Sequence, residues 1–267
     1  MGSETNPTVC AIMLTKDRPQ MAARAVECFR QQTYENKHLI IYDNGLTYPS
    51  LDQPKVIHVR AIGAVGSTVG ALRNYAIDLA LADIIVHWDD DDWSHSNRIA
   101  EQVALLQSSG ADAVGYREML FWRETGWKCQ TIEVSKSGLM SDPSVYREMY
   151  PGPVEYTGEA WLYTNNDPRY IVGSSLCYWR KAWERRPFKD IMRGEDHEFW
   201  SGLKSVGGCV SYCRHPTVCH DADCEPRMIC SIHGGNTAGY TEKTLTTSIN
   251  WRRVPEWDEH CRKVMTL

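Results

Sequence analysis

Four consecutive aspartates, residues 89–92, follow directly on the run IIVHW at residues 84–88. That apolar run is typical of a buried strand. Neighbouring carboxylates repel one another, and burying an unpaired one is costly. A divalent cation would relieve the repulsion, because Mg²⁺ and Mn²⁺ prefer hard oxygen ligands and bridge to substrate phosphates. Alternate residues of an extended turn face the same side, so Asp89 and Asp91 are the candidate ligands.

The alternative is a solvated acidic turn that caps the helix expected from about Ser96. One or two acids suffice for a helix cap, and this chain has four. The excess favours a metal site.

A second acidic group lies far along the chain, in GEDHEFW at residues 194–200. A carboxylate within hydrogen-bond reach of a hydroxyl can take its proton as that hydroxyl attacks. The alternative is an ordinary helix start, because Glu195 and Asp196 suit the positive end of a helix. A group that leaves as a diphosphate develops negative charge, which a cation stabilises. A metal-binding pair and a separate base are therefore the minimum set for transfer from a diphosphate to a hydroxyl.

The elements around these acids alternate between strands and helices. Short apolar runs predict strands at residues 8–14, 38–45, 55–60 and 83–88. Helical spacing predicts helices at residues 19–32 and 96–110, and the stretch 64–82 begins glycine-rich and becomes a helix. This alternation is typical of an α/β fold with a mostly parallel sheet, whose ligands bind beyond the carboxyl ends of the strands. One crevice at those ends would collect Thr15, Asp17, Asp43 and the aspartate run.

The composition is that of an ordinary globular chain. Of its 267 residues, 42% are hydrophobic and 24% are charged, which allows a sizeable core. The net charge of −5 argues against a protein that coats nucleic acid, because phosphate binding needs a basic face. No apolar run reaches the roughly 20 residues of a membrane span, and the first residues lack the features of a secretory signal. We therefore expect a cytoplasmic protein without a transmembrane anchor.

Ten cysteines is a high count, and half of them lie in the segment 209–233 together with three histidines. That segment is a candidate for structural zinc. It contains no CxxC pair, however, so the usual ligand spacing is missing. Reduced thiols in a cytoplasmic protein are the favoured alternative.

Four stretches of the chain resemble glycosyltransferase family 2, whose members have the GT-A fold. They are FRQQTYENKHLIIYDNG, GALRNYAIDLALADIIVHWDDDD, GEDHEFW and IHGGNTAGYT, in this order. The match covers residues 8–106 and resumes at GEDHEFW. The chain lacks a Gln-x-x-Arg-Trp motif and membrane segments after the Glu-Asp pair, which argues against a processive polysaccharide synthase.

The resemblance implies donor-binding roles for residues at the strand ends and in the glycine-ARN helix. These are Thr15, Asp17, Arg18, Asp43, Arg73, Asp89 and Asp90. Asp43 is expected to hydrogen-bond the nucleotide base, which favours uracil and leaves guanine second. Arg73 is expected near the base and the phosphates.

The resemblance also implies a metal site and a catalytic base. Asp91 is expected to contact Mn²⁺ or Mg²⁺, with Asp89 on the ribose or on a metal-bound water. His233, in the C-terminal loop, is a further metal candidate, with a structural histidine as the alternative. Asp196 is expected to be the catalytic base, with Glu195 beside it.

We therefore predict an α/β protein with the GT-A fold: a Rossmann-like, mostly parallel central sheet flanked by helices, with a small C-terminal extension. The predicted GT-A domain is residues 1–245, divided into a nucleotide-sugar-binding half at 8–106 and an acceptor-side half at 107–245. A helical tail carrying Trp251 and Trp257 is predicted at residues 246–267.

The predicted function is metal-dependent, inverting transfer of a sugar from a nucleoside-diphosphate sugar to a hydroxyl acceptor. UDP is the favoured nucleotide and GDP the second. The acceptor stays open among glycan, protein, lipid and modified DNA base, and so does the oligomeric state. Two alternatives are a nucleotidyltransferase that acts on sugar phosphates and a non-catalytic binding domain with the same shell.

Overall fold

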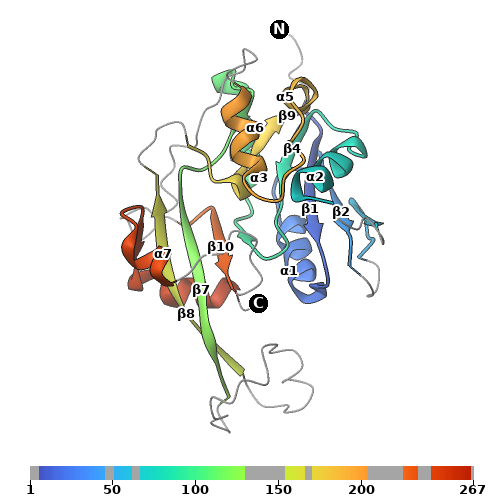
Figure 1. Cartoon of the computed structure of the whole chain (residues 1–267). Helices are drawn as coiled ribbons and strands as arrows, with labels where there is room; N and C mark the ends of the chain where they lie inside the picture. Colours follow the sequence, from blue (N-terminus) through green and yellow to red (C-terminus); the bar gives the residue numbers. More distant parts are fainter. Residues whose placement is uncertain are drawn as a thin grey trace. The chain divides into compact units, whose positions relative to one another are not determined.

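The computed structural model describes residues 6–45, 51–61, 67–129, 154–165, 170–203, 225–233 and 242–265 (Figure 1). The chain forms two compact units that interleave along the sequence. Unit 1 consists of Met1–Leu120 and Tyr163–Cys230, and unit 2 consists of Phe121–Leu162 and Ser231–Leu267. The sequence predicts consecutive segments, and those boundaries stay a prediction.

Unit 1 is built on a six-stranded sheet in the order β3-β2-β1-β4-β9-β6. Its strands are β1 (Val9–Thr15), β2 (Lys37–Asp43), β3 (Val56–Arg60), β4 (Ile84–His87), β6 (Ala113–Val114) and β9 (Cys177–Trp179). The first four pair in parallel, and Thr15 stands beside Asp43 in the register of β1 and β2. Strand β9 runs antiparallel to both β4 and β6. The predicted mostly parallel sheet is therefore confirmed, with one reversed strand.

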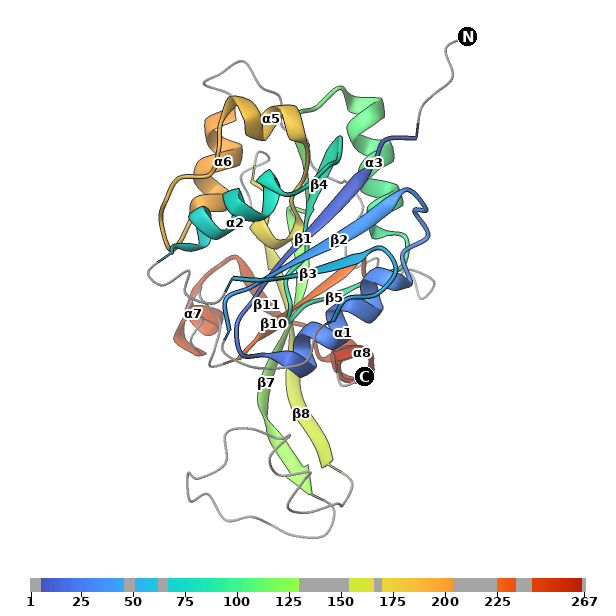
Figure 2. The same cartoon turned by 90° about the vertical axis from the view of Figure 1, so that its right-hand side faces the viewer.

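Helices cover both faces of this sheet (Figure 2). In unit 1 they are α1 (Pro19–Arg30), α2 (Val69–Asp78), α3 (Arg98–Ser109), α5 (Arg180–Arg185) and α6 (Glu195–Leu203). Alternate residues of a strand point to opposite faces. Val9 and Ala11 accordingly pack in the cluster with α1 and α3, whereas Cys10 and Ile12 pack in the cluster with α2, α5 and α6. Burial on both faces explains why these strands read as continuous apolar runs.

The helices of unit 1 begin and end at recognisable signals. Pro19 opens α1, where a missing N–H costs nothing. Gly110 ends α3 in the left-handed conformation, with φ at 64°. The helix expected within residues 64–82 begins at Val69, because Thr68 caps it by accepting a hydrogen bond from Ala71 N–H.

Unit 2 holds most of two long strands and the C-terminal elements. They are β7 (Glu118–Cys129), β8 (Val154–Thr164), α7 (Glu242–Thr247), β11 (Trp251–Arg253), η3 (Pro255–Trp257) and α8 (Asp258–Met265). The predicted tail helix is correct only for α8. Trp251 instead lies in a strand beside β8, where it packs on Phe121, and Trp257 ends a 3-10 turn that Pro255 opens. None of the helices in the described ranges has the length and hydropathy of a membrane-crossing helix.

The turn that follows α1 ties this helix to the segment after the aspartate run. Gln32 is buried, and its Nε2 donates to His95 O over 2.8 Å. Its Oε1 accepts a hydrogen bond from Ile99 N at 3.1 Å, near the start of α3. Thr33 N–H donates to Ser96 O over 2.8 Å. The turn therefore fixes the chain on the far side of the aspartates.

Replacing Gln32 with leucine keeps the size of the side chain but removes both of these bonds. A buried polar group left without its partner costs about 1–3 kcal/mol, so Gln32→Leu is expected to lower the free energy of unfolding in urea by at least that amount. Gln31→Leu is the matched control, because Gln31 is exposed and bonds to Glu27 within α1. Its effect is expected to stay within about 0.5 kcal/mol. Equal losses in the two variants would contradict the role given to Gln32.

Candidate active site

Side chains from three strand ends meet at the carboxyl edge of the parallel strands in unit 1. Thr15, at the end of β1, donates from Oγ1 to Asp90 Oδ2 over 2.7 Å. Asp17 follows β1 in the left-handed conformation, with φ at 54°. A Cβ on Gly45 would stand 2.7 Å from Asp17 N, so the chain after β2 needs glycine there. The predicted gathering of the loop after β1, the end of β2 and the aspartate run is what the structure has.

Arg18 bridges the middle of the aspartate run. Its Nη1 atom lies 3.1 Å from both Asp90 Oδ1 and Asp91 Oδ2. Arg24, on α1, donates from Nη2 to the backbone oxygen of Asp91 over 2.7 Å. Both aspartates are buried, whereas the Arg18 side chain is 28% exposed. The Arg18 guanidinium therefore neutralises part of the negative charge of the aspartate run, which a divalent cation would also neutralise.

Burial disfavours the charged form of the carboxylates in the aspartate run. Burial raises the pKa of Asp90 to about 7, and the neighbouring Asp91 adds to this shift, although Arg18 and the Thr15 hydroxyl oppose it. Burial likewise raises the pKa of Asp89, and Arg73 opposes that shift. Carboxylates whose pKa is raised in this way gain most from an added cation. The oxygen donors of the run fit Mg²⁺ or Mn²⁺.

No group of three or more histidine, cysteine or carboxylate side chains in the described ranges is arranged to hold a metal ion by itself. Asp89 and Asp91 would therefore hold the cation together with oxygens from a bound diphosphate, which is the usual way in which Mg²⁺ is bound. His233 belongs to unit 2, and its role as a ligand stays a prediction.

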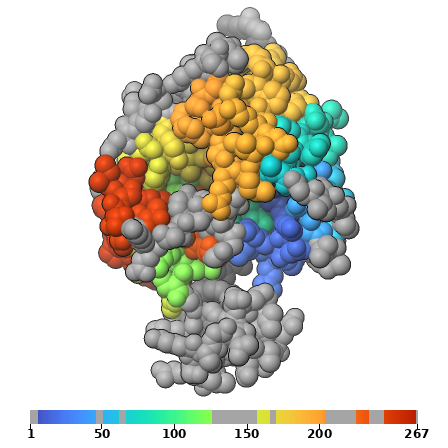
Figure 3. Space-filling view, in the orientation of Figure 1, coloured from blue at the N-terminus to red at the C-terminus, as the bar shows by residue number. Residues whose placement is uncertain are grey.

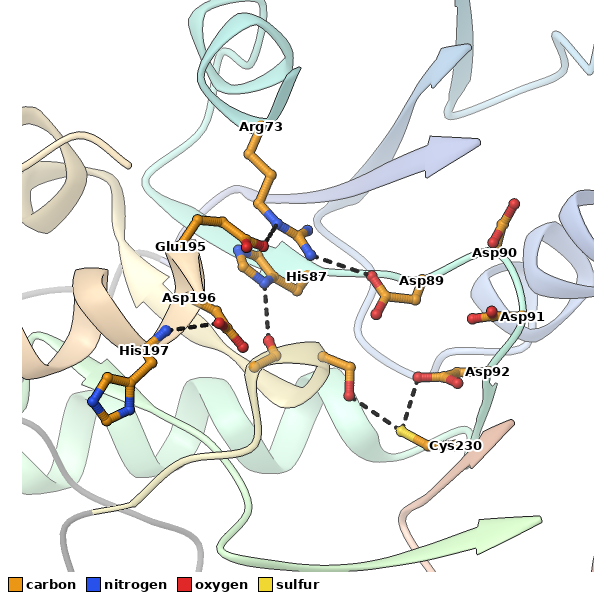
Figure 4. A network of polar contacts seen from close by, with 12 residues as sticks. Arg73, His87, Asp89, Asp90, Asp91, Asp92, Glu195, Asp196, His197 and Cys230 are labelled. Carbon is orange, nitrogen blue, oxygen red and sulfur yellow. Dashed lines mark hydrogen bonds and ion pairs between the residues drawn. The ribbon is translucent and has the colours of Figure 1, made fainter. Parts of the chain in front are cut away.

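Arg73, on α2, joins the two acidic groups (Figure 4). Its Nε donates to Glu195 Oε1 over 3.2 Å, and its Nη2 lies 3.7 Å from Asp89 Oδ1. Burial alone would lower the pKa of Arg73, but Asp89, Glu195 and Asp196 raise it. Its Nη1 is buried, and the described part of the chain offers it no hydrogen-bond partner. Buried donors are nearly always satisfied, so this N–H group can donate to a water or to an oxygen of a bound ligand.

Asp196 and Glu195 stand together at the start of α6 but differ in their surroundings. Glu195 is buried, and burial raises its pKa, with the Arg73 guanidinium opposing that shift. Asp196 is half-buried, and its Oδ1 accepts a hydrogen bond from His197 N–H at 2.8 Å. Among the described residues, Asp196 forms no ion pair with an arginine or lysine. Asp196 is therefore the better placed of the two to take a proton.

The Asp196 carboxylate packs directly on a glycine. A Cβ on Gly173, the first residue of η1 (Gly173–Ser175), would lie 1.5 Å from Asp196 Oδ2. The three atoms nearest to that position all belong to Asp196. Any side chain at Gly173 would therefore move this carboxylate. In Figure 3, α2 and α6, which carry Arg73 and Asp196, lie side by side on the face shown.

The last aspartate accepts a hydrogen bond from a thiol. Cys230, on β10 (Met228–Ile232), donates from Sγ to Asp92 Oδ2 over 3.0 Å. Since the thiol has a single proton, the Ser174 hydroxyl donates to the sulfur at 3.2 Å. Burial raises the pKa of Cys230, and Asp92 adds to the shift, so the thiol stays neutral. The other cysteines of the segment 209–233, the candidate for structural zinc, lie outside the described residues.

Asp43 is fully buried and engaged on both oxygens. Gly45 N–H donates to its Oδ1 over 2.7 Å, and His58 Nε2 lies 3.0 Å from its Oδ2. Leu51 N–H donates to His58 Nδ1, so Nε2 carries the proton and donates to the carboxylate. Arg60 adds an ion pair at 3.4 Å. The contact predicted between Asp43 and a nucleotide base stays a prediction.

Sequence reasoning missed three polar residues behind the run: His87, Arg98 and Gln102. All three are fully buried. Burial, together with the charge of Arg73, holds the pKa of His87 well below its usual range, so this imidazole is neutral. The available signal is an arginine and a glutamine four residues apart on the apolar side of a predicted helix, and the sequence does not say what they bond.

Residues 10–140 match the family described as glycosyl transferase family 2. This segment is similar to that family, and the α/β architecture of the chain is the GT-A fold. The resemblance and fold expected from the sequence are therefore confirmed. The chain carries a glycosyltransferase domain.

Three relatives illustrate the likeness. WcaA of Escherichia coli K12, named as a colanic acid biosynthesis glycosyl transferase, is 31% identical over 112 residues, or 39% of each chain. S. aureus TarS 1-349 in complex with UDP-GlcNAc is 13% identical, with a TM-score of 0.55 over 88% of this chain and 61% of that one. The mannosyltransferase PcManGT from Pyrobaculum calidifontis, in complex with GDP-Man and Mn²⁺, is 13% identical, with a TM-score of 0.53 over 86% and 57%. The chain thus spans between 39% and 61% of the length of these relatives.

The position of Arg18 predicts competition with a cation for the aspartate run. In the protein without nucleotide, Arg18→Gln is expected to raise the affinity for Mn²⁺ by up to about tenfold, because loss of a charged hydrogen bond is worth on the order of 1.4 kcal/mol. Calorimetric titration of Mn²⁺ measures this. Arg30→Gln is the control, because Arg30 is exposed and pairs with Glu27 on the surface of α1. Unchanged or weaker Mn²⁺ binding by Arg18→Gln would rule out the competition.

Proposed function

We propose that the protein is a metal-dependent, inverting glycosyltransferase that moves a sugar from a nucleoside-diphosphate sugar to a hydroxyl acceptor. The observation that carries the proposal is Arg73, which pairs with acids of both acidic groups and keeps a buried N–H without a partner in the described ranges. An anionic oxygen of the donor would satisfy that N–H by a charge-assisted hydrogen bond. Similarity to glycosyl transferase family 2 supports the same reaction class.

Transfer requires that the negative charge on the leaving diphosphate be stabilised and that the attacking hydroxyl lose its proton. The cation held by Asp89 and Asp91 supplies, when bound, Lewis-acid stabilisation of the leaving diphosphate. Asp196 takes the proton of the attacking hydroxyl, as a general base. Glu195 stays with Arg73 and keeps its guanidinium in place. Attack from the side opposite the leaving group inverts the configuration at the anomeric carbon.

The proposed donor is a UDP-sugar, with a GDP-sugar second. Asp43 would accept a hydrogen bond from a ring N–H of uracil, and its orientation by His58 and Arg60 supports such a role. Because Asp43 is fully buried, one of its present partners must give way to the base. TarS in complex with UDP-GlcNAc and PcManGT in complex with GDP-Man support these two nucleotides.

The proposed acceptor is a hydroxyl on a glycan, a protein, a lipid or a modified DNA base. A cytoplasmic location is also part of the proposal. It is supported by thiols among the described residues that form no disulfide there: Cys10, Cys28, Cys230 and Cys261.

Metal binding is expected to depend on the nucleotide, because the diphosphate supplies ligands that the chain lacks. Mn²⁺ is titrated by calorimetry into the protein alone and with UDP, GDP, CDP or ADP. UDP is expected to raise the Mn²⁺ affinity most and GDP second. Asp91→Asn is expected to abolish this gain, with an unchanged circular dichroism spectrum.

Mn²⁺ affinity that no nucleotide changes would remove the donor site from the proposal. A preference for CDP or ADP would show instead that Asp43 does not read the base.

Loss of the Asp196 carboxylate is expected to lower the reaction rate far more than loss of a charge at a helix end. Asp196→Asn should lower the hydrolysis of UDP-sugars or their transfer by about 10²–10⁴-fold while nucleotide and Mn²⁺ still bind. Gly173→Ala should give a comparable loss with Asp196 still present, because the added methyl group takes the place of the carboxylate. The readout is the rate constant at saturating donor.

Glu198→Gln is the control, because Glu198 lies in the same first turn of α6 and its side chain is 39% exposed. A charge at a helix end contributes about 0.3–1 kcal/mol, which is less than tenfold in rate. If Asp196→Asn behaves like Glu198→Gln, or if the product retains the anomeric configuration, Asp196 is not an inverting base.

A further inference from the structure

The turn η1 (Gly173–Ser175) presents three consecutive carbonyl groups, and a different buried side chain donates to each. His87 Nδ1 donates to the first over 2.9 Å, Arg98 Nη2 to the second over 2.9 Å, and Gln102 Nε2 to the third over 2.7 Å. The exposed fractions of these residues are 1%, 0% and 0%. Every backbone oxygen of the turn therefore accepts a hydrogen bond from a buried polar side chain.

The three donors bracket the aspartate run in the sequence. His87 ends β4, directly before the run, whereas Arg98 and Gln102 lie in the first turns of α3, directly after it. Arg98 also donates to His87 O and to Ser94 Oγ, both over 2.9 Å. Arg98 therefore holds both ends of the aspartate run, and the same guanidinium holds the middle of the turn.

Arg98 and Gln102 are locked together. Arg98 Nε donates to Gln102 Oε1 over 3.3 Å, which directs the Gln102 amide N–H towards the turn. The Arg98 guanidinium also lies 5.1 Å from the ring of Trp88. In the described part of the chain, no carboxylate lies within ion-pair distance of Arg98. A fully buried arginine bonded to neutral groups is costly, and hydrophobic packing alone does not require it.

The turn contacts both acidic groups. Its first residue, Gly173, supports the Asp196 carboxylate, as the clash of a Cβ with Oδ2 shows. Its second residue, Ser174, reaches Asp92 through the Cys230 thiol. A shift of the turn would therefore change the distance between Asp196 and the aspartate run.

We propose that Arg98, Gln102 and His87 are positioning residues: they hold the Gly173–Ser175 turn so that the base carboxylate stands at a fixed distance from the metal-binding aspartates. This inference rests on the proposed function. Reactions between held groups are sensitive to such distances, because a misplacement of about 1 Å can lower a rate by about 10²-fold.

Gln102→Met tests the proposal, because it removes one donor to the turn and keeps a side chain of similar length. We expect the rate constant for hydrolysis of a UDP-sugar with Mn²⁺ to fall by about 10- to 100-fold. The KM for the donor and the affinity for Mn²⁺ with UDP should stay within about threefold, since Gln102 bonds to none of the four aspartates in the described ranges and Arg98 keeps its bonds to His87 O and Ser94 Oγ. Gln107→Met is the control, because Gln107 is an exposed residue on the same helix.

A merely structural role is distinguished by a double-mutant cycle with Asp196→Asn. If Gln102 acts by positioning Asp196, Gln102→Met should lower the rate further by less than about twofold once the carboxylate is gone. Losses that multiply in the double variant, or a Gln102→Met rate equal to that of Gln107→Met, would overturn the proposal.

His87 provides a second variant pair in case Gln102→Met does not fold. His87→Asn keeps an N–H near the position of Nδ1, whereas His87→Leu removes it. The rate constant of the asparagine variant is expected to be at least tenfold higher than that of the leucine variant. Equal rates for the two would count against the proposal. Failure of the proposed function is seen separately, as a parent protein that neither binds UDP with Mn²⁺ nor hydrolyses any UDP- or GDP-sugar.

Discussion

Uncompensated negative charge at the carboxyl end of β4 is the constraint on which the arrangement of unit 1 depends. Four carboxylates follow the strand, and burial raises the pKa of at least Asp89 and Asp90. The arginines near the run come from different elements. Arg18, from the loop after β1, and Arg73, from α2, pair with its aspartates, whereas Arg98, from α3, bonds the residues on either side of it. Each arginine takes its place only if its own element is docked correctly. The charge of the run is thereby coupled to the packing of both helix layers.

The Arg73 guanidinium interacts with both acidic groups. It donates a hydrogen bond to Glu195 and lies close to Asp89, so its positive charge attracts a carboxylate of each group. The neutral imidazole of His87 and the neutral thiol of Cys230 add hydrogen bonds close to the run without adding charge. Such neutral donors hold the backbone and Asp92 in place, and they leave the balance of charge to the arginines and to a bound cation.

Much of this arrangement follows from the sequence. The run at residues 84–88 predicts a buried strand, and polar residues at the ends of parallel strands converge by topology, as Thr15 and Asp90 show. The roles of buried polar residues do not follow. Arg98 looks like any polar residue near a helix start, because the acceptor that gives it this role, Ser174 O, lies 76 residues away in the sequence, and that proximity is tertiary. The enclosure of Asp43 by His58 and Arg60 was likewise invisible, since it depends on the register of β2 and β3. Trp251 was placed in a helix, yet pairing beside β8 overrides a weak local preference.

The order of these parts along the chain has a consequence for chimeric proteins. The Gly173–Ser175 turn, β9, α5 and the start of α6 form one unbroken stretch that ends with Asp196. The side chains that seat this stretch are encoded about 70 to 85 residues earlier, at His87, Arg98 and Gln102. An exchange of the acceptor-side segment between relatives at a junction near residue 107 would therefore separate the turn from its own supports. A junction upstream of β4 would keep the two together.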